Sequence, residues 1–367
     1  MKIAILSMQR VINYGSFLQA YSLKRILESW GHSVQFLDIM DKTGSIDYIQ
    51  QYNVPELQFQ VKKMVRRLLR PSYYYASFER LHLFYRELFP TLGIEQPMRP
   101  DQEKYDLLII GSDEIFNCCQ TDSPFENSAY LFGKGVNATR KISYAASFGN
   151  TTIDKLRNAD LSDAVSAQLS QLNAICVRDQ NSYEIVNELT GKESVICVDP
   201  VFLSDYQERI PKKVRHTNYL LVYGYDGRIA EPEIISSVQL FARERKLTII
   251  GIGMAQKWCD LNIVVDPFEL LAYFRDAEYI VTDTFHGTVF SIKFQKRFAA
   301  VIRDSNQQKL GYLLESFNLL SRVAAQYKQI PEILTAEYSK NDVTQLIQAY
   351  KEKGLNYLAS EVESQNE

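Results

Sequence analysis

The sequence predicts an α/β protein made of two doubly wound domains that face a cleft. Short apolar runs alternate with helix-like stretches in two long parts of the chain, and a polar segment separates those parts. The length of 367 residues suits two or three domains. We therefore expect a first domain over 1–203 with a helical insertion near 42–104, a linker over 204–217, a second domain over 218–340, and a C-terminal helix and tail over 341–367.

The first domain opens with a strand, a helix and a second strand. KIAILSM (2–8) is short and apolar, which is typical of a buried strand. FLQAYSLKRILESWG (17–31) has apolar residues close to helical spacing and ends at Gly31, a suitable residue just past a helix. HSVQFLDIM (32–40) predicts the next strand. Such a unit implies parallel strands joined by a right-handed crossover.

The alternation continues through both domains. Residues 42–104 have weak periodicity and many Tyr, Arg and Pro residues, and we interpret them as helices over the sheet. Later strands are predicted within YDLLIIG (105–111), KISYAAS (141–147), NAICV (173–177), SVICV (194–198), YLLVYG (219–224), KLTIIGIG (246–253), EYIVTD (278–283) and RFAAVIR (297–303). Helices are predicted over 154–173, from Tyr183, near 231–245, over 267–277, after Asp283, and over 341–360 with Asn341 or Asp342 as its cap.

Composition and charge exclude several classes of protein. Apolar residues make up 46% of the chain and charged residues 23%, as in ordinary globular proteins. The net charge of −3 leaves no general basic field for nucleic acid. The most basic stretch, KKMVRRLLRP (62–71), could rest on anionic lipid or form a solvated helix face. No apolar run reaches the roughly 18 residues of a membrane-spanning helix.

The cysteines indicate a reducing compartment. The chain has 5 Cys and no CxxC pair, so we expect neither a disulfide framework nor a metal site. Cys176 and Cys197 lie in apolar runs and should be buried, while Cys118 and Cys119 receive no role. We expect a cytoplasmic protein, and contact with the inner face of the membrane stays open.

The loops that follow the strands should carry the function, because ligands bind at the carboxyl ends of parallel strands. In the first loop, Asn13 or Ser16 could cap the next helix, whose positive end could bind an anion. Gly15 would allow close approach of the backbone, and Tyr14 lies between these residues. Plain helix capping is the alternative.

Two further loops offer charged side chains. Ser112 and Asp113 follow a central strand, and the carboxylate could orient or deprotonate a hydroxyl group or simply cap a helix. Arg178 follows the strand that ends at Val177, where a guanidinium suits bidentate binding of phosphate or carboxylate. An interdomain salt bridge is the alternative, and Asp179 or Ser182 would cap the helix beyond.

The stretch TDTFHGTVFSI (282–292) contains one of the 4 histidines, at a junction of strand and helix. His286 could act as a neutral base, as an acid held protonated by a bound anion, or as a helix cap. Asp283, Thr284 and the Gly287-Thr288 pair complete this loop. The four loops together favour a small, multiply charged donor that bears phosphate.

The sequence lacks a complete nucleotide-binding glycine loop. No GxxxxGK[ST] loop is present, so hydrolysis of a nucleoside triphosphate is not expected. GIGMA (251–255) is only a partial glycine loop. We expect no cofactor.

Six motifs, in this order, resemble the polysaccharide pyruvyl transferase family: NYGSFLQAYSL, IIGSDEIFN, ISYAASFG, VRDQNS, VDPVFL and TDTFHGTVFSI. The resemblance runs from residue 1 to about residue 305. It implies two Rossmann-like domains in an arrangement akin to GT-B glycosyltransferases. It also implies transfer of a pyruvyl group from phosphoenolpyruvate to a saccharide, as a ketal across two hydroxyl groups, in the synthesis of cell-surface polysaccharide.

The resemblance assigns roles to residues of this chain. Arg178 matches the arginine expected to hold the phosphate or carboxylate of the donor, and His286 matches the expected acid. From position alone, Asp113 or Asp283 could orient or deprotonate the acceptor. The remaining residues predicted to bind substrate are Ser112, Thr284, Gly287, Thr288, Asn13, Tyr14, Gly15 and Ser16.

The chain departs from the family pattern at three places. Glu114 and Phe116 stand where many relatives carry Gln and Trp, which we interpret as tuning for the acceptor. NYGS replaces the GNxGD-type first loop of some members, a change that bears on the acceptor more than on the donor.

The expected partners are phosphoenolpyruvate and a saccharide acceptor, which could be lipid-linked. One alternative is a GT-B-like glycosyltransferase that uses a nucleotide sugar, with Asp266 or Glu269 on the ribose. Another is a non-catalytic subunit of a polysaccharide assembly complex.

Overall fold

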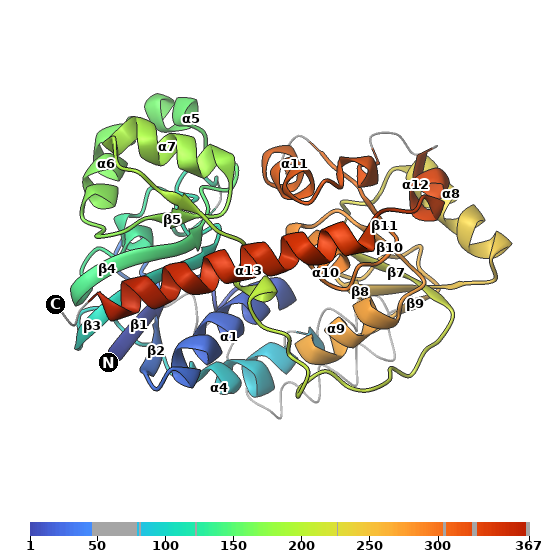
Figure 1. Cartoon of the computed structure of the whole chain (residues 1–367), viewed down its shortest axis with the longest axis horizontal. Coiled ribbons are helices and arrows are strands. Elements are labelled where there is room, and N and C mark those ends of the chain that lie inside the picture. The colour runs from blue at the N-terminus through green and yellow to red at the C-terminus, as the bar shows by residue number, and fades with distance from the viewer. Residues whose placement is uncertain are drawn as a thin grey trace.

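The computed structural model describes residues 1–45, 79–80, 82–121, 123–225, 227–303, 306–324 and 329–364. It contains two α/β domains, each built on a parallel sheet, and a long C-terminal helix that runs along both (Figure 1). The predicted fold class is therefore confirmed.

The sheet of the first domain has six strands in the order β2-β1-β3-β4-β5-β6, all parallel. The strands are β1 (Lys2–Leu6), β2 (Ser33–Leu37), β3 (Lys104–Asp113), β4 (Asn137–Ala146), β5 (Cys176–Val177) and β6 (Val195–Ile196). The helices are α1 (Tyr14–Ser29), a π-helical turn (Phe84–Leu88) that runs into α4 (Phe89–Leu92), α5 (Ile153–Asn158), α6 (Ser162–Ser170) and α7 (Gln180–Thr190), with 3₁₀ turns at Ala129–Phe132 and Pro200–Phe202. The central strands β1 and β3 read as continuous apolar runs because helices cover both faces of the sheet.

The sheet of the second domain has five parallel strands in the order β11-β10-β7-β8-β9. Its strands are β7 (Tyr219–Gly224), β8 (Thr248–Gly253), β9 (Leu261–Asn262), β10 (Tyr279–Thr282) and β11 (Phe298–Ala300). Its helices are α8 (Pro232–Glu244), α9 (Pro267–Asp276), α10 (Phe285–Lys293), α11 (Gln307–Ser316) and α12 (Ile330–Thr335), with a 3₁₀ turn at Leu320–Arg322. The last helix of the chain is α13 (Lys340–Glu363).

Three local predictions differ from the structure. The predicted helix over 154–173 is two helices, and Asp160, between them, has a left-handed φ of 54° that interrupts the helical hydrogen bonding. The cap of α13 is Ser339, not Asn341 or Asp342, since its side chain accepts from the backbone N–H of Asp342. The strand β9 and the helices α11 and α12 were not predicted.

Part of the predicted insertion lies outside the described residues. Its described helical parts are 79–80 and 82–92, and the basic stretch 62–71 lies outside the described residues. Cys176 and Cys197 are buried, as predicted. Among the described residues, no helix is both long and apolar enough to cross a membrane.

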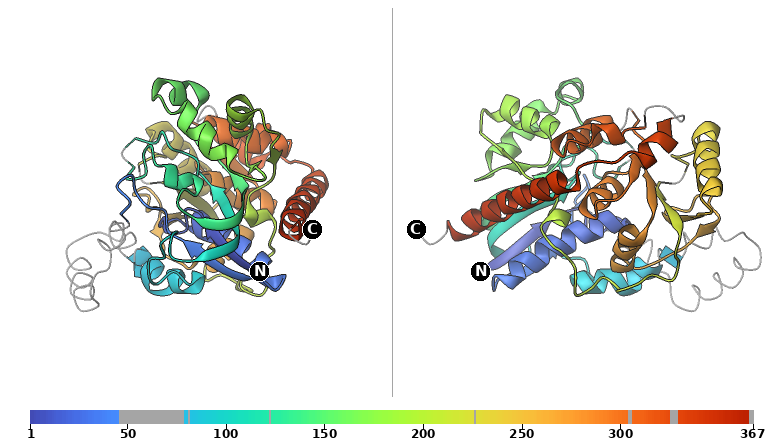
Figure 2. Two further views of the ribbon diagram at one scale, coloured as in Figure 1. Left: turned by 90° about the vertical axis from the view of Figure 1, so that its left-hand side faces the viewer. Right: turned by 45° about the vertical axis from the view of Figure 1, so that its right-hand side comes forward.

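Helix α13 links the two domains along the outside of the molecule (Figures 1 and 2). Near its C-terminal end Glu361 forms an ion pair with Arg140 of β4 at 2.8 Å, and the Tyr357 hydroxyl donates to the backbone oxygen of Ser143 at 3.0 Å. Helix α13 therefore braces the two domains against each other. The predicted domain limits stay a prediction.

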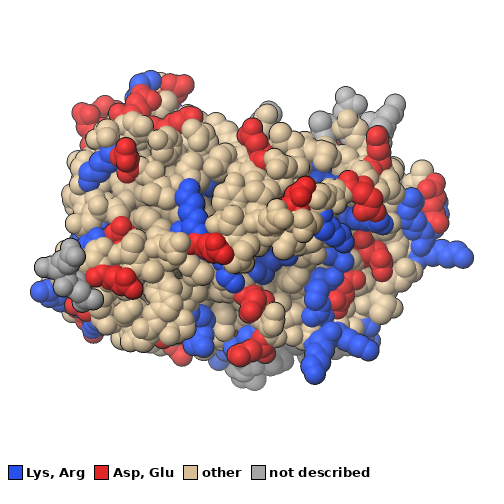
Figure 3. Space-filling model, in the orientation of Figure 1, with Lys and Arg blue, Asp and Glu red and all other residues tan. Residues whose placement is uncertain are grey.

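Acidic and basic side chains are interspersed over the face that carries α13 (Figure 3). This distribution agrees with the small net charge of −3. The described residues of that face therefore present no large field of one sign to a polyanionic partner.

Each sheet has a point where the strand order reverses, and these points position the site. The reversal lies between β1 and β3 in the first sheet and between β7 and β10 in the second. Ligands of open parallel sheets bind outside the carboxyl ends of the strands at such points. Here the loops after all four strands line one cavity between the domains.

Candidate active site

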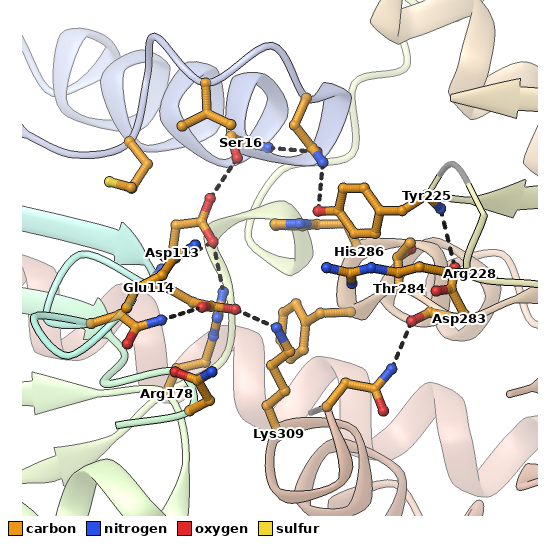
Figure 4. A pocket seen from close by; sticks show the side chains of 18 of the residues that line it. Ser16, Asp113, Glu114, Arg178, Tyr225, Arg228, Asp283, Thr284, His286 and Lys309 are labelled. Atoms are coloured by element: carbon orange, nitrogen blue, oxygen red, sulfur yellow. Dashed lines mark hydrogen bonds and ion pairs between the residues drawn. The ribbon is translucent and has the colours of Figure 1, made fainter. Parts of the chain in front are cut away.

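The cavity has a volume of about 320 Å³ and is lined by both domains (Figure 4). Of the predicted site residues, seven line it: Asn13, Ser16, Asp113, Arg178, Asp283, Thr284 and His286. The other five, Tyr14, Gly15, Ser112, Gly287 and Thr288, lie behind its walls.

The N-terminus of α1 forms one wall. Asn13 is the cap, because its Oδ1 accepts from the N–H groups of Gly15 at 2.7 Å and Ser16 at 3.4 Å. Its Nδ2 donates to the Tyr225 hydroxyl of the second domain at 2.9 Å. Ser16 is not the cap, and its hydroxyl instead donates to Asp113 at 2.5 Å. The cap of α1 therefore also joins the two domains.

Asp113 ends β3 in a strained conformation. Its φ of 73° lies in the left-handed region, which residues other than glycine adopt at an energetic cost. This conformation turns the carboxylate into the cavity, where Oδ1 is 3.9 Å from a terminal nitrogen of Arg178. Asp113 is thus a carboxylate of the first domain that can reach a bound hydroxyl group.

Arg178 is held in a buried position. One terminal nitrogen lies 3.1 Å from Asp199, and the guanidinium stacks on the ring of Phe285 at 3.9 Å from the ring centroid. Asp179 caps α7 by accepting from the N–H of Ser182, so Arg178 directly precedes that helix. Its Nε has no hydrogen-bond partner within the described part of the chain. The guanidinium is therefore rigid and retains an unused donor.

His286 lies in the first turn of α10. The cap of that helix is Thr284, which accepts from the N–H of Gly287 at 2.9 Å, so the histidine is not a capping residue. The Nε2 atom is 3.3 Å from Oδ2 of Asp199, an ion-pair distance without good hydrogen-bond geometry. The imidazole is 7% exposed. The ring nevertheless lines the cavity, whereas its Nε2 atom is buried.

Sequence reasoning missed Asp199, the residue that joins these groups. Its fully buried carboxylate accepts from Ser112 at 3.2 Å and from the N–H of Val201 at 3.0 Å, and it contacts both Arg178 and His286. Burial alone would raise the pKa of Asp199, but its interactions with His286 and Arg178 and the N–H of Val201 hold that pKa below its usual value. The available signal was an acid that follows a strand and precedes Pro200, as acids follow other strands of the site.

Asp283 of the second domain is paired within its own domain. The Asp283 side chain is fully buried, forms a close ion pair with Arg303 and accepts from the N–H of Tyr225 at 3.3 Å. Burial raises the pKa of Asp283, and Arg303 offsets part of that rise. Its carboxylate therefore holds the loop after β7 rather than standing free in the cavity.

Sequence reasoning also missed two cations of the second domain. The Arg228 guanidinium lines the cavity and lies 4.4 Å from the ring centroid of Tyr225. Lys309 of α11 forms a close ion pair with Glu114 across the cleft, and Asn117 donates to the same carboxylate at 2.8 Å. Glu114, one of the departures from the family pattern, thus bridges the two domains.

Phe116, the other departure from the family pattern in the loop after β3, does not line the cavity. Phe116 is fully buried and stacks on Phe132 with a centroid distance of 4.8 Å. It packs the first domain beneath the cavity, so its side chain does not contact a ligand there.

The site is built to bind negative charge. Helices α1, α7 and α10 all begin next to it, and the N-terminus of a helix carries partial positive charge and free N–H groups. Arg178, Arg228 and His286 add cationic or proton-donating side chains. Two parallel α/β domains with such a site between their switch points define a protein of the GT-B-like class.

The chain belongs to the polysaccharide pyruvyl transferase family, whose model matches residues 13–305. That match covers the N-terminus of α1 and the loops after β3, β5, β7 and β10. No curated protein sequence matches the chain.

Solved structures resemble the fold at low sequence identity. One from Listeria monocytogenes, described as a UDP-N-acetylglucosamine 2-epimerase, aligns with a TM-score of 0.51 and 10% identity, over 99% of this chain and 96% of the other. A UDP-N-acetylglucosamine 2-epimerase from Rickettsia bellii aligns with a TM-score of 0.49 and 11% identity, over 100% and 97%. The glycotransferase of kitacinnamycin aligns with a TM-score of 0.48 and 10% identity, over 99% and 98%. The first of these likenesses supports the fold and nothing finer.

Proposed function

We propose that this protein transfers the pyruvyl group of phosphoenolpyruvate to a saccharide and forms a pyruvate ketal. The observation that carries the proposal is the meeting of Arg178 and His286, from different domains, on the carboxylate of Asp199 beside the cavity. Phosphoenolpyruvate carries a phosphate and a carboxylate in one small molecule. It therefore suits a small site with several cations and helix N-termini.

In the proposed reaction, His286 protonates the methylene carbon of phosphoenolpyruvate, and the neighbouring carbon becomes oxocarbenium-like. A first saccharide hydroxyl attacks that carbon, the bond from carbon to the phosphate oxygen breaks, and inorganic phosphate leaves. A second hydroxyl then closes the ketal. One of the two hydroxyl protons returns to the enzyme and replaces the proton that His286 gave. The other leaves with the phosphate. An acid positioned in this way contributes about 10²–10⁴-fold to the rate.

The proposed base is Asp113, assisted by Ser16. The Ser16 hydroxyl donates to the Asp113 carboxylate at 2.5 Å, and both line the cavity. Asp283 suits this role less well, because its carboxylate is buried against Arg303. We assign Asp283 to positioning of the Tyr225 loop, where Asn13 also binds.

The donor is proposed to lie between the cations of the two domains. Arg178 holds one anionic group from the first domain, and Arg228 can reach the cavity from the second. The family implies a saccharide acceptor. Free and lipid-linked saccharides both stay open as acceptors, so the assay includes both.

The test is incubation of the protein with phosphoenolpyruvate and a panel of free and lipid-linked saccharides. The expected result is an acceptor that gains the mass of one pyruvyl ketal while one phosphate is released. No phosphate release with any acceptor would favour a non-catalytic subunit. Thermal stabilisation by UDP but not by phosphoenolpyruvate would favour a glycosyltransferase that uses a nucleotide sugar.

A further inference from the structure

Two adjacent cysteines, Cys118 and Cys119, lie at the edge of the cavity. They stand between Asn117 and Gln120, two residues that line it. Of the 5 cysteines of the chain, Cys119 is the one whose side chain is not buried, whereas Cys118 is 2% exposed and belongs to the core of the first domain. The pair therefore offers one thiol to solvent and keeps the neighbouring thiol inside.

We propose that Cys119 is a site of reversible oxidation by hydroperoxides, at which Cys118 closes a disulfide with Cys119 and loosens the adjoining wall of the cavity. This modification goes beyond the proposed function and does not depend on it, because no step of pyruvyl transfer uses either thiol.

The surroundings of Cys119 favour its thiolate, which is the form of cysteine that reacts with peroxides. Hydrogen bonding with the Cys118 thiol lowers the pKa of Cys119. Thr151 and Lys155 act in the same direction, whereas burial and Glu126 oppose them. The same hydrogen bond, together with burial, raises the pKa of Cys118. A partly exposed thiol with a lowered pKa beside a second cysteine is typical of redox-sensing sites.

The proposed oxidation by hydrogen peroxide takes two steps. The Cys119 thiolate attacks one peroxide oxygen, so that an S–O bond forms, the O–O bond breaks, and the hydroxide that leaves takes up a proton. The Cys118 sulfur then attacks the sulfenic sulfur of Cys119. An S–S bond forms, the S–O bond breaks, and the hydroxyl group leaves as water with the proton of Cys118. Two electrons pass from the thiols to the peroxide, and a dithiol reductant reverses the change.

Closure of this bridge must change the backbone of the pair. Adjacent Cα atoms across a trans peptide are about 3.8 Å apart, whereas disulfides usually join Cα atoms about 4.4–6.8 Å apart. In the reduced loop, the Cys119 N–H donates to the Thr151 hydroxyl at 3.2 Å, and the backbone oxygen of Cys118 accepts from the N–H of Asn127 at 2.8 Å. These bonds depend on the reduced backbone conformation. The strained bridge should also be easily reduced.

The loop is connected to a contact between the domains. The Thr151 hydroxyl donates to Oδ1 of Asn117 at 2.8 Å, and Nδ2 of Asn117 donates to Glu114 at 2.8 Å. Glu114 forms the ion pair with Lys309 of the second domain. A backbone change at Cys119 therefore removes a support of Asn117, and the series of contacts ends at α11 across the cavity.

The first experiment treats the whole protein with hydrogen peroxide at pH 7, alkylates the remaining thiols under denaturing conditions, and maps the cysteine peptides by mass spectrometry. The peptide with Cys118 and Cys119 should lose the mass of two hydrogen atoms, resist alkylation, and recover both thiols after dithiothreitol. Cys176, Cys197 and Cys259 are buried and should stay reduced. In Cys118→Ala, Cys119 should instead gain oxygen, because that variant lacks the second thiol.

Hydrogen exchange measures the effect on the cavity wall. Backbone amides of residues 113–120 and of α11 should exchange at least about threefold faster in the oxidised protein, and dithiothreitol should restore the slower rate. Cys259→Ala is the matched control and should respond like the wild type, whereas Cys119→Ser should not respond.

Two reduced thiols after peroxide treatment, or a wild-type Cys119 that keeps oxygen instead of forming the bridge, would overturn the site. A bridge that forms with unchanged hydrogen exchange would overturn its connection to the cavity. Neither measurement needs a donor or an acceptor. A protein that forms the bridge but transfers no pyruvyl group would therefore keep the inference and lose the proposed function.

Discussion

Gly15 lies directly against the imidazole of His286, although the two residues belong to different domains. A Cβ placed on Gly15 would come 2.1 Å from Cγ and 2.2 Å from Nδ1 of that ring. The first turns of α1 and α10 therefore meet at this point, and only the absence of a side chain allows it. The contact places the positive ends of two helices beside one candidate acid.

Gly15→Ala should displace His286 with little effect on the fold of either domain. Because displacement of a catalytic group by about 1 Å can cost about 10²-fold, we expect a loss of that order in kcat/KM for pyruvyl transfer. Gly311→Ala is the control, since a Cβ there meets no atom within 4 Å. A Gly15→Ala enzyme with the wild-type kcat/KM would show that the ring position does not matter.

His286→Ala should lower kcat by about 10²–10⁴-fold, because the variant lacks the proposed acid. The variant should still fold, although the loss of a buried imidazole and of its contact with Asp199 should lower the thermal unfolding midpoint. Steady-state rates of phosphate release and a thermal melt provide the two measurements. Full turnover by this variant would remove the histidine from the mechanism.

Arg178→Ala should chiefly raise the KM for phosphoenolpyruvate. A charge-assisted hydrogen bond contributes about 1.5–3 kcal/mol, so we expect a rise of roughly 10–100-fold. Arg178→Lys keeps the charge beside Asp199 but loses the planar fork, and should recover only part of the affinity. An unchanged KM in both variants would contradict the role of Arg178 in binding the donor.

Lys293, at the C-terminal end of α10, should make stability depend on pH. Burial, aided by Lys351, lowers the pKa of Lys293 to about 8. Since an unfolded lysine has a pKa of about 10.4, the folded state binds fewer protons between these values, and stability must rise with pH across that window. Below pH 8 Lys293 is protonated in the folded state, so the folded state bears the full free-energy cost of burying the charged ammonium group.

Chemical denaturation at pH 8 and at pH 10 measures this effect. The increase in the free energy of unfolding between the two pH values should be smaller by about 2 kcal/mol in Lys293→Met than in the wild type. The exposed Lys213→Met provides the control and should keep the wild-type increase. Equal increases in wild type and Lys293→Met would show that Lys293 is not the source.

Much of the fold could be predicted because its signals are short-range. The apolar run of β3 and the helical spacing of α1 depend only on neighbouring residues, and both elements lie where expected. Capping was ambiguous where two suitable residues stand close together. Asn13 rather than Ser16 caps α1, because the helix begins at Tyr14, and the Ser16 hydroxyl instead donates to Asp113, a residue far away in the sequence.

The site could be predicted only loop by loop. Arg178, Asp113 and His286 each follow a strand, so the rule for parallel sheets was enough to select them. Asp199 escaped notice because the motif VDPVFL shows only an acid after a strand, and its contacts with Arg178 and His286 arise only in the folded protein. Arg228 and Lys309 were missed for the same reason, since each faces the wall of the cavity that the first domain forms, and only the fold brings them there.

Patterns along the chain were therefore sufficient for the two α/β domains, the family and the loops that bear the site, because periodicity, turn residues and motifs are local. The partners of each charge were decided only by folding. The two parallel sheets face each other with the carboxyl ends of their strands. This arrangement brings together Ser112, Arg178, Asp199 and His286. Electrostatic interactions depend on distance in space, and the spacing of residues along a sequence does not contain that distance.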